Sequence, residues 1–394
     1  MYTETGFPLF DELAAEFERQ YPNVTFDIIN EEQTALETNA PRLLSGDDAP
    51  DFVRLDLKPD LVRDGLLLNL QPYAEAYGWT DIPASLLAPN RVNDEGTVLG
   101  EGDLYGFGAT ANLTGVFYNR ALAERVGMEE IPSSVEEFEA VLADAKDAGI
   151  LPIVQSNAAG TATLSFQSLA DQYVPAQTLR DWIFNTPGAS IETDGAVEAA
   201  DRLQTWMREG YINADTNAVD YTTMVGRFVN GEALFMILGN WQSAGLAEQM
   251  GEDAGFFLFP AAKTGGSLTA ASVFGGAVIP ARAKHPDAAA YFLNWMVSDP
   301  TARQLALDLT GMVPPPVPGA PDLEVVPGTT VADGLEAFDA LVADDGAVGF
   351  LDTATSGLAQ DSMTPLLQML LDDRISPEDF IAQLQADYEE DLDR

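Results

Sequence analysis

The amino-terminal part of the chain carries a helical pattern followed by an alternating one. Apolar residues recur at i, i+3, i+4 and i+7 from Phe10 to Phe17, which predicts an amphipathic helix that Pro22 ends. Apolar and polar residues then alternate over 24–28, and the run 51–56 is typical of a short buried strand. A helix followed by a strand is the second half of a βαβ unit. No strand pattern precedes this helix, so we predict that the first strand is missing.

The middle of the chain shows the order strand, helix, strand. Strand-like runs at 105–108 and 115–119 precede a helix that begins at a capping box, Ser134 with Glu137, and the apolar run 150–154 follows. This order predicts a parallel sheet with right-handed crossovers. There is no internal repeat, and further segments are expected as strands at 233–237, 256–259 and 272–279 and as helices at 165–210, 221–230 and 287–297.

Composition narrows the chemistry. The 394 residues include 63 acidic and 19 basic ones, for a net charge of -44. Such a charge excludes a nucleic-acid partner, because phosphate contacts need a basic surface, and it disfavours anionic ligands. The chain has no cysteine and a single histidine, His285, which excludes disulfides, cysteine-ligated metals and a cysteine nucleophile. No apolar run is long enough for a transmembrane helix.

No pattern predicts a cofactor, a metal or a catalytic residue. The sequence lacks GxGxxG, Walker A and GxSxG motifs, and Asp215-Thr216-Asn217 lacks the glutamate that completes an EF-hand. A glycoside hydrolase or lyase would need two carboxylates about 5–10 Å apart across a cleft. With 63 acidic residues, adjacent acids arise by chance, so we interpret these pairs as solvated surface.

A sugar site is the chemistry that the loops favour. Neutral sugars are held by aromatic faces and by Asp, Asn and Gln side chains on loops at strand ends. Four loops and Asp56 fit this description, and we expect Trp241 to stack on the sugar ring. The candidate ligand-binding residues are Asp56, Thr110, Asn112, Gln155, Ser156, Asn157, Asn240, Trp241, Phe274, Gly275 and Gly276.

An ordered set of segments resembles the extracellular solute-binding proteins of ABC importers, in the sugar-binding family that includes maltose-binding protein (family 1). One such pair of segments is Phe228-Val229-Asn230-Gly231-Glu232-Ala233 with Gly239-Asn240-Trp241. Each segment is weakly specific alone, but the ordered set covers nearly the whole chain. The others are 10–18 with 21–24, 44–46 with 49–51, 104–107 with 117–119, 131–132 with 136–138, 284–289 with 292–296, and 311–314.

The resemblance implies an α/β, two-lobed periplasmic-binding-protein-like fold (type II) with a ligand cleft between the lobes. Projected onto this chain, the lobes are roughly 1–109 plus 264–311 and 112–260 plus 312–394. Family members carry a lipoprotein signal and a first strand ahead of the helix with which this sequence opens. If that strand is absent, we expect lower stability and weaker binding.

The function implied is that of a non-enzymatic receptor, a monomer that binds a neutral sugar or oligosaccharide and delivers it to the permease subunits of an ABC importer. Its implied location is extracytoplasmic, in the periplasm or lipid-anchored at the outer face of the membrane. Two alternatives stay open. One is a carboxylate-dependent glycoside hydrolase or lyase, and the other is a receptor of the same fold for a polyol, a peptide or a metal complex.

Overall fold

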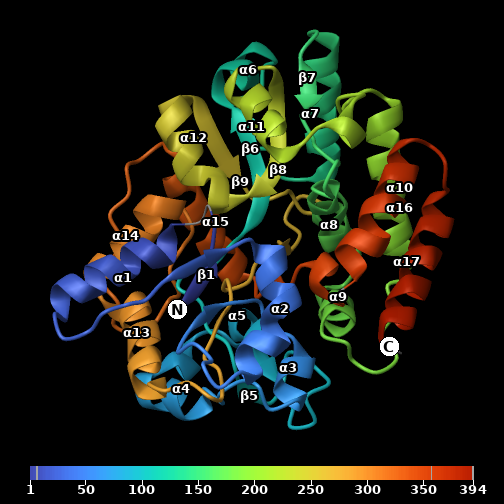
Figure 1. Ribbon diagram of the computed structural model, residues 1–394. Coiled ribbons are helices and arrows are strands. Elements are labelled where there is room, and N and C mark those ends of the chain that lie inside the picture. The colour runs from blue at the N-terminus through green and yellow to red at the C-terminus, as the bar shows by residue number, and fades with distance from the viewer. Residues whose placement is uncertain (6–7, 356, 393–394) are drawn as a thin grey trace. The chain divides into compact units, whose positions relative to one another are not determined.

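The computed structural model describes residues 1–5, 8–355 and 357–392, which form two compact units (Figure 1). The first unit is Met1–Asn112 with Val273–Val325, and the second is Leu113–Ser272 with Val326–Arg394. The sequence placed the third passage between lobes near 311–312, whereas here it follows Val325. The proline-rich segment stays with the first unit because the Ala111 N–H donates to the Val313 carbonyl at 2.7 Å.

The sheet of the first unit has four strands in the order β11-β3-β1-β2. Strand β1 (Tyr2–Glu4) pairs in parallel with β2 (Ile29–Glu31) and with β3 (Val53–Arg54), while β11 (Ala277–Val278) is antiparallel to β3. The prediction of a missing first strand is therefore wrong, and β1 is an inner strand of the sheet. Three residues are too few to show an alternating pattern, and the buried one is the polar Thr3.

The strand predicted at 24–28 is not part of a ladder, and β2 begins at Ile29 instead. The reason lies in Phe26, whose ring packs against Phe292 with centroids 4.8 Å apart. Its N–H donates to the Glu18 carboxylate at 2.6 Å rather than to a neighbouring strand. The alternation of apolar residues thus reflects packing onto helices.

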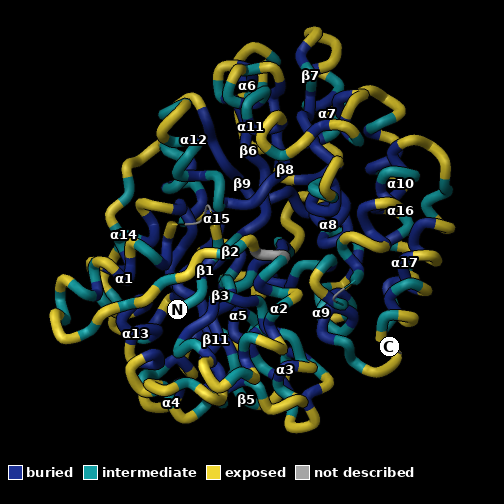
Figure 2. The backbone as a smooth tube through the Cα atoms, in the orientation of Figure 1, coloured by how far each residue is buried: buried dark blue, intermediate teal, exposed yellow. Residues whose placement is uncertain are grey.

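The helices of the first unit bury their apolar faces in a common core. Figure 2 colours the backbone of buried residues dark blue. The predicted amphipathic helix is α1, and Phe17 on its buried face contacts Phe292 and Trp295 of α13 at centroid distances of 5.1 Å. These contacts confirm the period read from the sequence. The bounds of these two helices and of the other elements of the unit are α1 Leu9–Gln20, α2 Gln33–Ser45, α3 Pro59–Arg63, α4 Gln71–Tyr77, α5 Ala84–Leu87, β4 Arg91–Val92, β5 Asp103–Leu104, α13 Pro286–Ser298 and α14 Pro300–Thr310.

The sheet of the second unit has the order β7-β8-β6-β9. Strands β7 (Leu151–Ile153) and β8 (Ala233–Gly239) are parallel, but β6 (Thr114–Asn119) is antiparallel to both β8 and β9 (Ala254–Phe257). The prediction of a parallel sheet is wrong for this part. Strand β8 lies between β6 and β7, and hydrophobic patterns carry no information on strand direction.

The helices of the second unit include a packed group formed by α8, α10 and α17 (Figure 1). Beside them, Trp182 of α9 stacks on Tyr388 of α17 with ring centroids 4.5 Å apart. No helix among the described residues is long and apolar enough to cross a membrane. The elements are α6 Arg120–Arg125, α7 Val135–Asp147, α8 Ala162–Tyr173, α9 Ala176–Ile183, α10 Asp194–Arg208, α11 Tyr221–Val229, α12 Ser243–Met250, β10 Ala270–Ala271, α15 Thr330–Ala343, β12 Ala347–Val348, α16 Thr364–Leu371 and α17 Pro377–Leu392.

A glycine contact in the first unit gives a stability prediction. A Cβ atom on Gly108 would lie 1.9 Å from the Gly275 carbonyl oxygen, a backbone atom that cannot rotate away. We expect Gly108→Ala to lower the free energy of unfolding by about 1–3 kcal/mol in a urea titration, since overpacking shifts the backbone. Gly46→Ala is the matched control, because its nearest contact would be an ordinary 3.6 Å. Equal stability of the two variants would contradict the close approach.

A buried acid in α8 gives a pH prediction. Asp171 is 3% exposed, its Oδ1 has no hydrogen-bond partner within the described part of the chain, and burial raises its pKa well above the usual value. Because the folded state holds this proton more tightly, the stability that it contributes is complete below the unfolded-state pKa and is lost as the pH rises towards the folded-state value.

Asp171→Asn removes that titration. We expect the free energy of unfolding of the variant, relative to the parent, to increase from pH 5 to pH 8 in chemical denaturation. Asp201→Asn, at an exposed position on α10, is the matched control for the substitution itself. A pH-independent difference for Asp171→Asn would show that the carboxyl group is already ionised in the folded protein.

Candidate functional site

One edge of the second unit's sheet gathers most of the predicted site residues of that unit. The carboxyl ends of β7 and β8 meet there because the two strands are parallel. Strand β6 runs the other way, so its first residue, Thr114, lies opposite Gly239 at the same edge. The loop Gln155–Asn157 follows β7 and Asn240-Trp241 follows β8, as the sequence predicted.

Buried polar atoms without a hydrogen-bond partner collect at this edge. Within the described residues they are Thr114 Oγ1, both side-chain atoms of Gln155, Ser156 Oγ and Asn157 Oδ1. The four residues are between 0% and 3% exposed. A buried polar atom left unpaired costs about 1–3 kcal/mol, so such a group requires an explanation. Together these atoms can bind a ligand that offers both hydrogen-bond donors and acceptors.

An aromatic group lies beside β8. Half-buried Trp241 donates its Nε1–H to the Tyr221 hydroxyl at 3.1 Å, and its ring centroid is 6.4 Å from that of Phe350. A Cβ on Gly239 would overlap the indole at 1.8 Å, so only glycine leaves room for this ring. Sequence analysis missed Tyr221 and Phe350, which no local motif connects to Trp241. Burial raises the pKa of Tyr221, which keeps its hydroxyl neutral.

Two predicted ligand residues accept backbone N–H groups with their side-chain oxygens. Asn240 Oδ1 accepts the Leu113 N–H at 2.9 Å, and Asn112 Oδ1 accepts the Val273 N–H at 2.9 Å. Leu113 and Val273 lie where the chain passes between the units. Each asparagine therefore holds the main chain of its own unit, next to a point where the chain passes to the other unit.

A charged group occupies the carboxyl edge of the first unit's sheet. Asp56, a predicted site residue, accepts Arg54 Nη1 at 3.1 Å, and Arg54 Nε lies 3.6 Å from the Glu4 carboxylate. Burial alone would lower the pKa of Arg54, but Asp56, Glu4 and Glu37 raise it above its usual value. Sequence analysis missed Arg54 and Glu4, although the spacing of Arg54 and Asp56 at i and i+2 places both on one face of the strand.

Neighbouring segments bring further predicted residues to this edge. A Cβ on Gly276 would lie 2.2 Å from the Leu55 carbonyl, and the Gly275 N–H donates to the Thr110 carbonyl at 3.0 Å. Phe274 is placed differently, because it is 1% exposed and its ring packs against Phe107 in the core. Nowhere in the described ranges do three or more acidic or histidine side chains form a group that could hold a metal ion.

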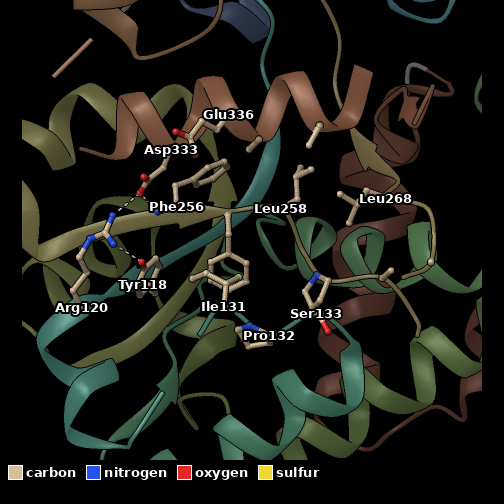
Figure 3. Close-up of a pocket in the computed structure, with 16 residues that line it drawn as sticks. Tyr118, Arg120, Ile131, Pro132, Ser133, Phe256, Leu258, Leu268, Asp333 and Glu336 are labelled. Atoms are coloured by element: carbon tan, nitrogen blue, oxygen red, sulfur yellow. Dashed lines mark hydrogen bonds and ion pairs between the residues drawn. The ribbon is translucent and has the colours of Figure 1, made fainter. Parts of the chain in front are cut away.

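A separate pocket of about 620 Å³ lies in the second unit between α15 and the edge strand β9 (Figure 3). At one end Arg120 donates to the Tyr118 hydroxyl and pairs with Asp333 at 2.7 Å, and Asp333 also accepts the Phe256 N–H at 3.0 Å. Burial raises the pKa of Asp333. The rest of the lining is mainly apolar, with Ile131 exposed at its rim.

This pocket is distinct from the edge with the unpartnered polar atoms. Tyr118 pairs with Phe235 towards the far end of β6, whereas Thr114 pairs with Gly239 at the near end. None of the predicted ligand residues lines the pocket. The unpartnered polar edge with Trp241 is therefore the candidate site of the second unit.

A curated relative shares sequence with much of the chain. The multiple sugar-binding protein of Streptococcus mutans is 24% identical over 293 residues, which cover 72% of this chain. The matched region spans 66% of that protein's own length.

Solved structures share the fold over the whole chain. A structure from work on xylan utilisation by the thermophilic bacterium Caldanaerobius polysaccharolyticus has a TM-score of 0.80 at 17% identity and covers 98% of each chain. The solute-binding protein RafE in complex with raffinose has a TM-score of 0.76 at 21% identity, covering 99% of this chain and 98% of its own. These likenesses confirm the predicted α/β, periplasmic-binding-protein-like fold class.

The family description "Bacterial extracellular solute-binding protein" matches residues 3–303. That range contains every one of the predicted ligand-binding residues, which lie between Asp56 and Gly276. The chain belongs to the bacterial extracellular solute-binding protein family.

Proposed function

We propose that this protein is the sugar-binding component of an ABC importer, which binds a neutral mono- or oligosaccharide and delivers it to the permease subunits. One observation carries the proposal, namely the buried, unpartnered atoms of Thr114, Gln155, Ser156 and Asn157 beside Trp241. A sugar hydroxyl both donates and accepts, so a sugar suits this mixture of amides and hydroxyls. The names of similar proteins, a multiple sugar-binding protein and a raffinose complex, support the same class of ligand.

The charges of the candidate residues favour a neutral ligand. The unpartnered atoms at this edge, those of Thr114, Gln155, Ser156 and Asn157, belong to uncharged side chains. Arg54 in the first unit is already within 3.6 Å of Glu4 and 3.1 Å of Asp56, so its charge is compensated within the protein. We propose that the predicted ligand-binding residues within each unit bind hydroxyl groups of a sugar.

We propose that the protein is a receptor and not an enzyme. Amide and hydroxyl groups such as those of Gln155, Ser156 and Asn157 cannot serve as the paired carboxylates of a glycoside hydrolase. The family's extracellular role supports a location outside the cytoplasm, and we propose a monomer in the periplasm or anchored by lipid at the outer face of the membrane.

A thermal-shift panel tests the proposed function. The purified chain is heated with raffinose, xylotriose, maltotriose, N,N′-diacetylchitobiose, a polyol and a dipeptide. A ligand at about 100 times its Kd adds about 2.7 kcal/mol of stability, which raises the melting temperature clearly. We expect a rise with at least one sugar and no product in chromatography. Product formation would support the hydrolase, and a rise only with the polyol or the dipeptide would replace the sugar by another solute.

Trp241→Ala tests the aromatic contact. We expect about 1–3 kcal/mol of lost binding free energy, or roughly a ten- to hundredfold higher Kd by calorimetry, because the aromatic ring that stacks on the sugar is removed. Trp241→Phe keeps a ring but loses the hydrogen bond to Tyr221, so it should retain most of the affinity. Unchanged affinity in Trp241→Ala would remove this residue from the site.

A further inference from the structure

We propose that a chain of hydrogen bonds fixes Asn157 as an acceptor in the candidate site, so that the protein selects ligands with a free hydroxyl at that point. The proposal rests on the proposed function, because it concerns what the same site accepts. It identifies Asn217, which lies outside the predicted site, as the residue that sets this selectivity.

The orientation of the Asn217 amide follows from its neighbours. Its Nδ2 lies 3.2 Å from the Gln368 carbonyl oxygen and 2.9 Å from Asp372 Oδ1. Carbonyl and carboxylate oxygens accept hydrogen bonds. The NH₂ group of Asn217, which donates them, must therefore face these two oxygens. The two ends of an amide are otherwise hard to tell apart, and here the hydrogen-bond network decides between them. Asn217 Oδ1 therefore faces Asn157.

The orientation of Asn157 follows in turn. Its Nδ2 donates to Asn217 Oδ1 at 2.9 Å, which leaves its Oδ1 on the other side of the amide. The main-chain groups of Asn157 are also occupied, because its N–H donates to the Thr216 carbonyl at 2.8 Å and its carbonyl accepts Gln368 Nε2 at 3.3 Å. Asn157 is fully buried, and Oδ1 is its one polar atom without a partner among the described residues.

The consequence is a site that discriminates by the direction of a hydrogen bond. A fixed carbonyl oxygen binds a hydroxyl, which can donate, but repels an ether or a methylated hydroxyl, which can only accept. Gln155 and Ser156 have both donors and acceptors available, so they tolerate either kind of group. Of the three neighbouring side chains, Asn157 alone imposes a donor on the ligand.

The position of the loop depends on a different set of contacts. The Gln155 N–H donates to Asn213 Oδ1 at 2.7 Å, and Asn213 Nδ2 donates to Asp215 Oδ1 at 2.8 Å. Arg227 pairs with Asp215 at 2.7 Å and holds it in place. Removing the Asn217 side chain leaves these contacts intact. We therefore expect Asn217→Ala to change the freedom of the Asn157 amide and not the place of the loop.

The first experiment needs no ligand. In ¹⁵N spectra, the side-chain NH₂ of Asn157, identified by its loss in Asn157→Asp, should exchange slowly with solvent in the parent protein. Asn217→Ala should speed that exchange at least tenfold, while Asn230→Ala, an exposed control in the same unit, should leave it unchanged. Equal exchange in the parent and in Asn217→Ala would overturn the chain of hydrogen bonds.

The second experiment measures selectivity with raffinose, or with another sugar of the panel that binds, and with its mono-O-methyl ethers. We expect one ether to bind the parent protein about tenfold more weakly than the free sugar, as for one lost hydrogen bond with an unpaired acceptor. In Asn217→Ala the Asn157 amide can turn its NH₂ to the ether, so this ratio should fall towards one. A purely steric effect of the methyl group would be the same in both proteins.

The outcomes separate the two proposals. An unchanged ratio in Asn217→Ala, with the free sugar still bound, overturns the selectivity and leaves the sugar receptor standing. If no sugar of the panel binds the parent, the proposed function fails, and the exchange experiment still decides whether Asn217 fixes the Asn157 amide.

Discussion

The pairing of strand β8 on both sides organises the second unit. All seven residues of β8 are buried, and the strand pairs with β7 on one side and with β6 on the other. Because β7 is parallel to β8 and β6 is antiparallel to it, the carboxyl ends of β7 and β8 and the first residue of β6 meet at one edge of the sheet. The residues Thr114, Gln155 and Trp241 come from distant parts of the sequence, and this pairing alone brings them together.

The two sheet edges differ in how their polar groups are paired. In the first unit, Arg54 lies between Glu4 and Asp56, so charge is compensated inside the protein. In the second unit, neutral polar atoms remain unpaired at the sheet edge where β7 and β8 end. Unpaired groups of this kind destabilise the free protein and are relieved when a ligand binds. The second unit therefore has more to gain from a ligand than the first.

Sequence reasoning succeeded where the signal was local. The period of α1, the capping of α7 at Ser134, and the loops after β7 and β8 could all be predicted, because each depends on residues close together in the chain. It failed where the presence or direction of a strand depends on its pairing with a distant strand. Strand β1 is too short to show a pattern, and the direction of β6 depends on β8, a strand far along the chain. Tyr221, Phe350 and Asn217 could not be found for the same reason, since their partners are fixed only by the fold.

The half-buried state of Trp241 also gives the protein an optical label. The chain has five tryptophans, and Trp79, Trp182, Trp206 and Trp295 are no more than 3% exposed. Water and solutes can therefore reach the indole of Trp241 far more readily than the other four. A quencher or a bound molecule at the edge of β8 would act on this one emitter, and the other four would provide a constant background from the cores of the two units.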